Sequence, residues 1–239
     1  MKRLFLVGLI FVSLTSSLFS QEAAKPIAPL QLSLYGDLCF PVKKYDVAGI
    51  GLGVFHSKID KVYGIQAAGF VAQNDTAYGL EIAGMGATSN KFCGIQIAGF
   101  GAQNMSLSGI QLSGFGCNTK TLYGIGISSI FAYENLYGFC FEIFGDIKYA
   151  KKCRGVQISG ITSKIVDIKG LQVSLYNETE SCNGVQAGLV NIADNVRGLQ
   201  IGIYNSCTDL KGVQLGLLNH CKKNTLFDVN TLPLINIGI

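Results

Sequence analysis

Apolar and polar side chains alternate along most of the chain with a period of two. Leu199 and Ile201, for example, alternate with Gln200 and Gly202. This is the period of a β-strand, because successive side chains of a strand point to opposite faces. Apolar residues do not recur at helical spacing in the repeated region, where a glycine every few residues would cost a helix about 1 kcal/mol each. The pattern predicts an all-β fold.

A glycine opens each of twelve repeated units. The unit glycines are separated by 14 or 15 residues, except for one separation of 17. Early units carry the phrase GIQIAGFGAQN and late ones GLQIGIYN, and the two types meet in an irregular unit at residues 138–154. So regular a period indicates a repeat architecture. The unit glycines are Gly49, Gly64, Gly79, Gly94, Gly109, Gly124, Gly138, Gly155, Gly170, Gly184, Gly198 and Gly212.

The length of the period favours one of two β architectures. In a parallel β-solenoid each unit is one full coil in the same surroundings, so the repeat recurs every coil. In an antiparallel barrel neighbouring units run in opposite directions, so the repeat should be about 28 residues long. We therefore expect a parallel β-solenoid of about twelve coils, roughly 58 Å long at ~4.8 Å per coil. An outer-membrane antiparallel β-barrel is the alternative, supported by the alternating end Ile235, Ile237 and Ile239.

Two columns of amide side chains are expected along the rod. Stacked identical amides form hydrogen-bonded ladders, and we place the first column on the outside and the second at a turn. The first column is Gln66, Glu81, Gln96, Gln111, Gln157, Gln172, Gln186, Gln200 and Gln214, and the second is Asn177, Asn191, Asn205 and Asn219. The interior is then assigned to the apolar set Val185, Leu199, Ile201, Val213 and Leu215. On this assignment Ile201→Asp should destabilise the chain far more than Gln200→Asp.

The chain divides into four segments. Residues 1–20 have the pattern of a secretory signal peptide: Lys2 and Arg3, an apolar run, then small residues. That run has about ten residues, whereas a membrane span needs about 20. Residues 21–48 are interpreted as a spacer and N-terminal cap strand, residues 49–221 as the repeat domain and residues 222–239 as a C-terminal cap.

Composition and charge exclude two classes of protein. Of the 239 residues, 49% are apolar and only 14% charged, which argues against disorder. The net charge of +4 falls to +2 once Lys2 and Arg3 are removed, because 17 basic then face 15 acidic side chains. Such a balance predicts no nucleic-acid partner.

The sequence predicts no catalytic, cofactor-binding or metal-binding residues. Residues 49–53, GIGLG, partly match a dinucleotide fingerprint but precede more strand repeats and not a helix. His56 and His220 are far apart and no CxxC pair occurs, so no metal site is expected. Five carboxylates, Glu134, Glu142, Asp146, Glu178 and Glu180, are assigned to solvated turns or the irregular unit. We interpret the protein as not an enzyme.

Cysteines and one basic cluster are the other candidates for chemistry. The cysteines are Cys39, Cys93, Cys117, Cys140, Cys153, Cys182, Cys207 and Cys221. We expect them to be small buried hydrophobes, with Cys207 and Cys221 reduced and at equivalent positions of successive coils. The basic cluster is Lys148, Lys151, Lys152 and Arg154 with Lys164 and Lys169. It is interpreted as a solvated flank, with binding of anionic lipid or sulfated glycan as the alternative.

Several stretches resemble a known family. PLQLSLYGDLCFPVKKYDVAGIGLGV at residues 29–54, VYGIQ at 62–66, the GLQIGIYN and GVQLGLLN units and the closing LPLINIGI resemble surface repeat proteins of spirochaetes, of the leptospiral type. Related VQxGLxN repeats occur in exported proteins of other Gram-negative groups. The resemblance implies an exported protein of the cell surface or outer membrane, with the periplasm as the alternative location, and supplies no catalytic residues.

These observations predict a non-enzymatic structural or interaction scaffold of the bacterial envelope. Its partners are expected among envelope or host-surface components, including the membrane, through the repeated flat faces that solenoids offer. The alternative is an outer-membrane barrel with a transport or structural role. A glycan-processing enzyme of the envelope is a third idea, which no residue constellation supports.

Overall fold

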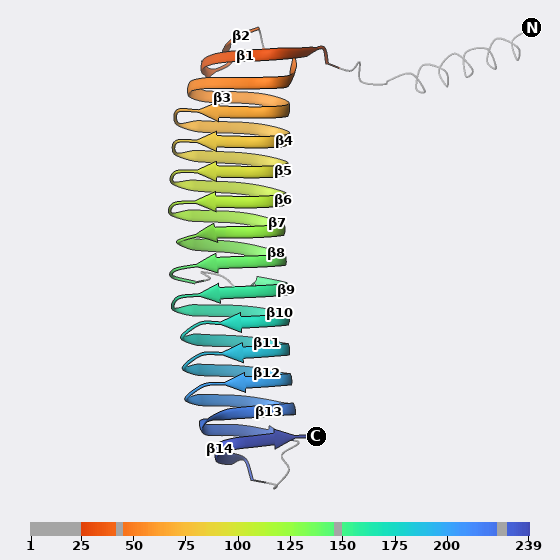
Figure 1. Ribbon diagram of the computed structural model, residues 1–239, viewed down its shortest axis with the longest axis vertical. Coiled ribbons are helices and arrows are strands. Elements are labelled where there is room, and N and C mark those ends of the chain that lie inside the picture. The colour runs from red at the N-terminus through yellow and green to blue at the C-terminus, as the bar shows by residue number, and fades with distance from the viewer. Residues whose placement is uncertain (1–24, 42–44, 146–149, 224–228) are drawn as a thin grey trace, which may run out of the picture.

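The chain forms a straight rod of stacked β-coils. A computed structural model describes residues 25–41, 45–145, 150–223 and 229–239. The coils follow one another in chain order from β1 and β2 at one end to β14 at the other (Figure 1). The strands are β1 (Ile27–Gly36), β2 (Leu38–Phe40), β3 (Asp46–Ala68), β4 (Val71–Ala83), β5 (Gly86–Ala98), β6 (Gly101–Ser113), β7 (Gly116–Ser128), β8 (Ile130–Glu142), β9 (Ala150–Ser159), β10 (Thr162–Val173), β11 (Tyr176–Ala187), β12 (Val190–Ile201), β13 (Tyr204–Lys223) and β14 (Thr231–Gly238).

Strand pairing decides between the two predicted architectures. From β3 to β13 every strand pairs in parallel with the next, and each residue lies beside its equivalent one repeat later. Gln200 is thus the register partner of Gln214, and Gly198 of Gly212. The predicted parallel β-solenoid is confirmed, and the antiparallel alternative is wrong.

The unit glycines form a column in which successive coils approach closely. All twelve have φ between 126° and 149°, a region that favours glycine. A Cβ atom added to any of them would lie 1.9–2.2 Å from a carbonyl oxygen of the preceding coil. From Gly64 onward this oxygen belongs to the preceding unit glycine. No other residue type fits this column, which accounts for its unbroken recurrence.

The interior is narrow and contains five inward side chains per coil. In the second coil these are Gln66, Ala68, Ala72, Asn74 and Ala77, which are all at most 7% exposed. The predicted placement of the glutamine column on the outside is therefore wrong: Gln200 is 0% exposed, whereas Ile201 is 43% exposed. Leu199, Val213 and Leu215 also point outward. The glutamines that were predicted outside thus lie inside, and the apolar side chains that were predicted inside lie outside.

The glutamine column can be buried because each amide is satisfied by the next coil. Gln214 Nε2 donates to Gln200 Oε1 at 2.8 Å, and Gln200 Nε2 to Gln186 Oε1 at 2.8 Å. Burying an amide is costly only when its hydrogen bonds are lost. Repetition supplies an identical partner in the coil above and in the coil below. The glutamine side chains therefore form a hydrogen-bonded ladder that runs along the rod.

The asparagine ladder is confirmed and explains the shorter late coils. Asn191 Nδ2 donates to Asn205 Oδ1 at 2.7 Å and to the Ile201 carbonyl at 2.9 Å. The amide lies over Gly202, where a Cβ atom would be 2.6 Å from Asn191 Nδ2. Early coils instead have alanine at both inward positions, as in Ala68 and Ala72. Asparagine opposite glycine thus replaces alanine opposite alanine when the coil loses one residue.

Near the irregular unit, large and small side chains exchange places. Gly126 and Cys140 occupy the glutamine column, and the ring of Phe131 fills the space beside Gly126. In the same coil the hydroxyl of Tyr133 donates to Gln157 Oε1 at 2.6 Å. The aromatic pair therefore keeps the interior filled and the next glutamine bonded.

Antiparallel strands cover both ends of the stack. β2 pairs with β1, and β14 pairs with β13. Asn236 of β14 is buried and donates from Nδ2 to Gln214 Oε1 at 2.9 Å, so it completes the glutamine ladder. β2 and β14 are then the edge strands of the sheet. The shortness of β2 and Pro233 in β14 discourage pairing of these edges with another chain.

Replacing a unit glycine should damage the fold, whereas replacing Gly116, which lies outside the column in open space, should not. Gly198→Ala would place Cβ 2.1 Å from the Gly184 carbonyl oxygen, so we expect a loss of roughly 3 kcal/mol or more in unfolding free energy. Gly116→Ala is the control, since its Cβ would have no neighbour within 4 Å; its stability should be unchanged or raised by up to about 1 kcal/mol. Urea denaturation measures both, and equal losses would contradict the role of the column.

A carboxylate should be tolerated at position 201 and not at position 200. Gln200→Asp removes a buried amide that bonds in both directions and leaves a charge inside, so we expect a loss of roughly 3 kcal/mol or more. Ile201→Asp changes a half-exposed outward side chain and should cost about 1 kcal/mol or less. Thermal unfolding in dilute solution compares the two. A greater loss for Ile201→Asp would show that the faces are reversed.

Candidate functional site

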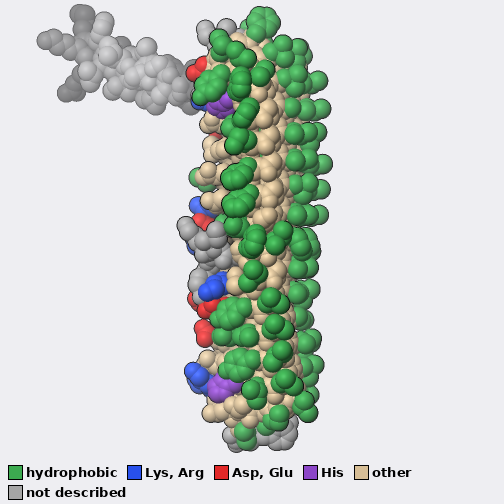
Figure 2. All heavy atoms as spheres, turned by 90° about the vertical axis from the view of Figure 1, so that its left-hand side faces the viewer, with side chains coloured by type: hydrophobic (Ala, Val, Ile, Leu, Met, Phe, Trp, Pro, Cys, Tyr) green, Lys and Arg blue, Asp and Glu red, His purple; other side chains and the backbone are tan. Residues whose placement is uncertain are grey.

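One side of the rod is apolar along its whole length. We call "apolar face" the 24 outward positions one and three residues after each unit glycine. Every one of them is Ile, Leu, Val, Phe or Ala: Ile50, Leu52, Ile65, Ala67, Leu80, Ile82, Ile95, Ile97, Ile110, Leu112, Ile125, Ile127, Phe139, Phe141, Val156, Ile158, Leu171, Val173, Val185, Ala187, Leu199, Ile201, Val213 and Leu215. Figure 2 shows apolar side chains in continuous rows along the rod, with the charged side chains gathered on another side.

The apolar face is flat. Ten of its side chains, from Ile50 to Leu215, have exposed fractions between 38% and 43%. The other 14 are less exposed. Because the coils stack in parallel, each side chain is flanked by the equivalent one in the coil above and below. In each of the twelve coils the face extends over four residues, from the unit glycine to the residue three positions later. At ~4.8 Å per coil and ~3.3 Å per residue its area is roughly 750 Å². Monomeric soluble proteins rarely expose so large a continuous apolar patch.

In the early coils, aromatic residues border the apolar face on both sides. On one side, the bend that follows the face carries an exposed row, the bend row: Phe55, Phe70, Met85, Phe100, Phe115, Phe144, Ile161, Leu175, Leu189, Ile203 and Leu217. Its rings stack between coils, with centroids 5.6 Å apart for Phe55 and Phe70. On the other side, Tyr63 stacks on Tyr78 at 5.4 Å, directly before the unit glycines.

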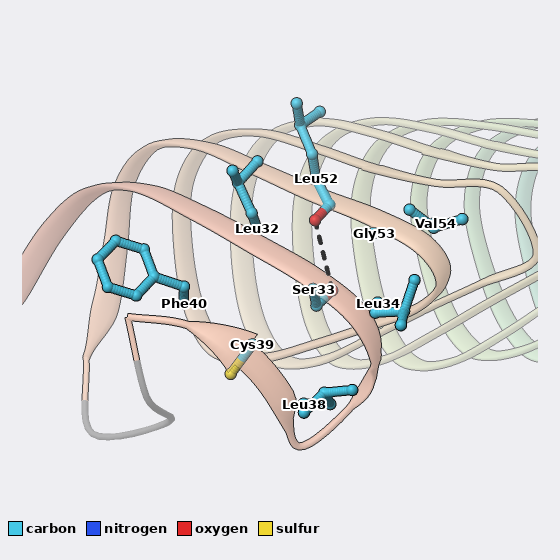
Figure 3. A pocket seen from close by; sticks show the side chains of 9 residues that line it. All are labelled: Leu32, Ser33, Leu34, Leu38, Cys39, Phe40, Leu52, Gly53 and Val54. Carbon is cyan, nitrogen blue, oxygen red and sulfur yellow. Dashed lines mark hydrogen bonds between the residues drawn. The ribbon is translucent and has the colours of Figure 1, made fainter.

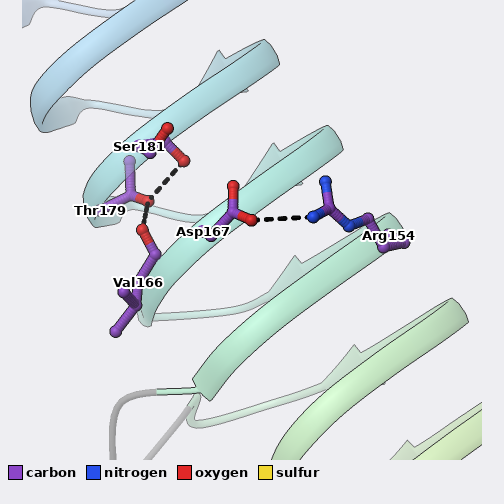
Figure 4. Close-up of polar contacts among 5 residues, drawn as sticks. All are labelled: Arg154, Val166, Asp167, Thr179 and Ser181. Carbon is purple, nitrogen blue, oxygen red and sulfur yellow. Dashed lines mark hydrogen bonds and ion pairs between the residues drawn. The ribbon is translucent and has the colours of Figure 1, made fainter.

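All outward charges of the described repeats lie on a second side, the polar face, which comprises the six positions before the next unit glycine. The predicted basic cluster belongs to it, and three of its members pair with acids from neighbouring coils. Arg154 pairs with Asp167 at 2.9 Å (Figure 4), Lys151 with Glu134 at 2.9 Å, and Lys164 with Glu178 at 3.1 Å. The cluster is therefore a mixed-charge surface; Lys148 lies outside the described residues.

The weaker candidates for chemistry are scattered along the rod. Residues 49–53 continue strand β3 and no helix follows them. His56 packs edge-on against Tyr35 near one end, and His220 Nδ1 lies 3.0 Å from Thr231 Oγ1 near the other. In the part of the chain that the structure describes, no three His, Cys, Asp or Glu residues gather as metal ligands would. Within the same residues, no helix is long and apolar enough to cross a membrane.

Two glutamates lie inside the solenoid. Glu142 was expected to be solvated, and this is wrong: it is 0% exposed and accepts hydrogen bonds from Gln157 Nε2 at 2.7 Å and from Ser159. Burial raises the pKa of Glu142. Glu134 and Glu178 lie on the polar face, as does Glu180, in agreement with the expectation. Asp146 lies outside the described residues.

Glu81 replaces a glutamine in the buried column. It accepts hydrogen bonds from Gln96 Nε2 at 2.8 Å and from Asn74 Nδ2, and it is 0% exposed. Burial raises the pKa of this carboxyl from 4.5 to about 7, although both hydrogen bonds act in the opposite direction. The sequence signal for this site was an acid at a position otherwise occupied by glutamine.

The cysteines behave mostly as small hydrophobes. Six of the eight are buried, all are free, and Cys93 is exposed. Cys207 and Cys221 are 3% and 0% exposed, so the expectation that this pair is buried is confirmed. Burial raises the pKa of Cys117 to about 11 and of Cys182 to about 12. At neutral pH these two thiols are protonated, which disfavours reaction as nucleophiles.

An apolar hollow continues the apolar face at its N-terminal end (Figure 3). It has a volume of about 630 Å³. Its wall contains Leu32 and Leu34 of β1, Leu38 and Phe40 of β2, and Leu52 and Val54 of β3. Ser33 also borders it, but its hydroxyl donates to the Leu52 and His56 carbonyls. The hollow therefore offers apolar contact and little to orient a polar ligand.

Comparison with known proteins identifies no relative. No family model, no curated protein and no solved structure matches the chain. The resemblance to spirochaete surface repeat proteins stays a prediction.

Ionisation of Glu81 should weaken the fold as pH rises. Because the pKa in the folded chain, about 7, lies above the ordinary value of 4.5, the folded state binds more protons between these two values. Stability is then highest at low pH and falls by roughly 3 kcal/mol between about pH 4.5 and pH 7.5. Glu81→Gln should remove most of this dependence and leave the part due to Glu142.

Unfolding in urea at a series of pH values measures this dependence. The control is Glu142→Gln, which keeps Glu81. In this variant the unfolding free energy should still fall with pH by the amount due to Glu81. A Glu81→Gln chain with the same pH dependence as the natural one would show that Glu81 is ionised in the fold at little cost.

Proposed function

We propose that the protein is a non-enzymatic, exported interaction scaffold of a bacterial envelope, and that the apolar face is its binding surface. The observation that carries the proposal is the apolar face itself, roughly 750 Å² of surface without a charged or polar side chain. Large exposed apolar patches mark sites of interaction. Solenoids commonly bind through such extended surfaces.

The chemistry of the surface supports a binding role over a catalytic one. Acid, base and nucleophilic catalysis require positioned polar groups, whereas all 24 side chains of the apolar face are hydrocarbon. The buried carboxylates Glu81 and Glu142 are bonded to interior amides and hydroxyls and are 0% exposed, so a substrate does not reach them in the folded rod.

Export is inferred from the sequence. Residues 1–20, which lie outside the described residues, have the signal-peptide pattern, and the family resemblance implies the cell surface or outer membrane, with the periplasm as the alternative. The transport role depended on the antiparallel alternative and is not proposed.

The proposal predicts that charges on the apolar face release the protein from the envelope. Ile97→Asp combined with Ile127→Asp places two carboxylates on the apolar face, where desolvation opposes binding. We expect the natural chain to fractionate with the envelope of expressing cells, and the double variant to appear mostly in the soluble fraction. The control is Ser106→Asp with Thr121→Asp, two outward positions of the polar face in neighbouring coils.

The control variant should remain with the envelope. Circular dichroism of both purified variants checks that the rod is intact. If the control variant is released as readily as the apolar-face variant, or if neither is released, the apolar face is not the binding surface.

A further inference from the structure

We infer that the apolar face is covered by a second copy of this chain, packed face to face. The inference rests on the proposed function, since it names the first partner of the same surface. Four features of the rod support it: the spacing of its rows, its area, the position of its charges and its closed ends.

The spacing of side chains on the apolar face matches that of another copy. The rows repeat once per coil, at about 4.8 Å, and stacked sheets interdigitate their side chains at a separation of about 10 Å. A second copy presents rows at the same interval over the same length, so every row of one rod can enter a gap of the other. Flat stacks of identical rows form dry, tightly packed interfaces of this kind.

The area agrees with that of a stable dimer. A specific protein interface of standard size buries about 800 Å² on each partner, and the apolar face offers roughly 750 Å². Dimer interfaces are also the most apolar ones, with charged residues depleted at their centre. All outward charges of the described repeats lie on the polar face, so bringing two apolar faces together leaves them in water.

The borders of the apolar face favour a protein partner over a lipid surface. Binding to anionic membranes depends on Lys and Arg beside the apolar surface. In the early coils the borders are formed by the bend row and by tyrosines such as Tyr63 and Tyr78, which stack on one another. In the early coils these stacked rings extend the flat surface. In the later coils the tyrosine position holds cations, namely Arg154, Lys169, Arg197 and Lys211. Asp167 and Asp209 lie among these cations, and Arg154 pairs with Asp167, so this part of the border is mixed in charge and not basic.

The closed ends favour a finite pair over a filament. β2 and β14 cover the terminal coils with antiparallel strands, which leaves the apolar face as the extended contact surface. A face that binds its own equivalent gives an isologous contact, which is used once per copy and ends at two.

The largest side chains of the apolar face lie near its middle. Phe139 and Phe141 follow Gly138, the seventh of the twelve unit glycines. Phe141 is 40% exposed, so its ring is available for contact. Large aromatic residues at the centre of an interface commonly contribute most of the binding energy. Phe141 is therefore the residue whose loss should weaken the dimer most.

Analytical ultracentrifugation of the full chain, purified without detergent, tests the inference. We expect a mass of about twice 25.5 kDa. Phe141→Asp should weaken dimerisation by about 30-fold or more. Leu112→Asp is a second variant of the same face and should act in the same direction. Thr121→Asp, on the polar face, should leave the dimer unchanged. Circular dichroism in dilute solution confirms that each variant is folded.

A monomeric natural chain, or a dimer that Thr121→Asp dissociates and Phe141→Asp does not, would overturn the inference. Flotation with phosphatidylcholine and phosphatidylglycerol vesicles distinguishes the rival occupant: a chain that is monomeric alone but floats with vesicles has a lipid partner. A third outcome separates the two proposals. If the apolar-face variant is released from the envelope but the purified natural chain is monomeric, the dimer is contradicted and the proposed function is supported.

Discussion

The close approach of successive coils at the unit glycines is the constraint on which the rest of the structure depends. At these positions a Cβ atom would lie about 2 Å from a backbone oxygen of the preceding coil, and φ is in a region that side chains disfavour. One residue in every 14 or 15 must therefore be glycine. This column sets the register, because when Gly198 lies on Gly184 every other residue of the coil also lies on its equivalent.

Exact stacking of equivalents explains the polar interior. A buried amide normally needs a specially placed partner, but in a repeating coil the partner is the same residue in the next turn. Gln186, Gln200 and Gln214 satisfy one another in this way. The ladder tolerates exceptions only when neighbours compensate: Glu81 accepts bonds from two amides, and the ring of Phe131 fills the space beside Gly126.

The same stacking makes the outer surface regular. Because the inward positions are taken by small, amide and a few apolar side chains, the second alternating set of Ile, Leu, Val and Phe lies outside, where its side chains are partly exposed. The charges are confined to another side of the rod. A flat, uncharged surface of this length is suited to a partner that is itself flat and apolar, and this is why we propose a scaffold and infer a second copy of the chain on its apolar face.

The period of the sequence by itself determined the all-β parallel solenoid, the neighbours in each amide ladder and the equivalent positions of Cys207 and Cys221 in successive coils. These follow from spacing, since residues one repeat apart must stack. Only the tertiary structure decided which set of side chains is inside. Strand alternation defines two faces but does not orient them, and average hydrophobicity favours Ile201 over Gln200 for the interior. The narrow coil reverses this preference because the amides pair across coils, a contact between distant residues. For the same reason the burial of Glu142 and the exposure of the apolar face were missed.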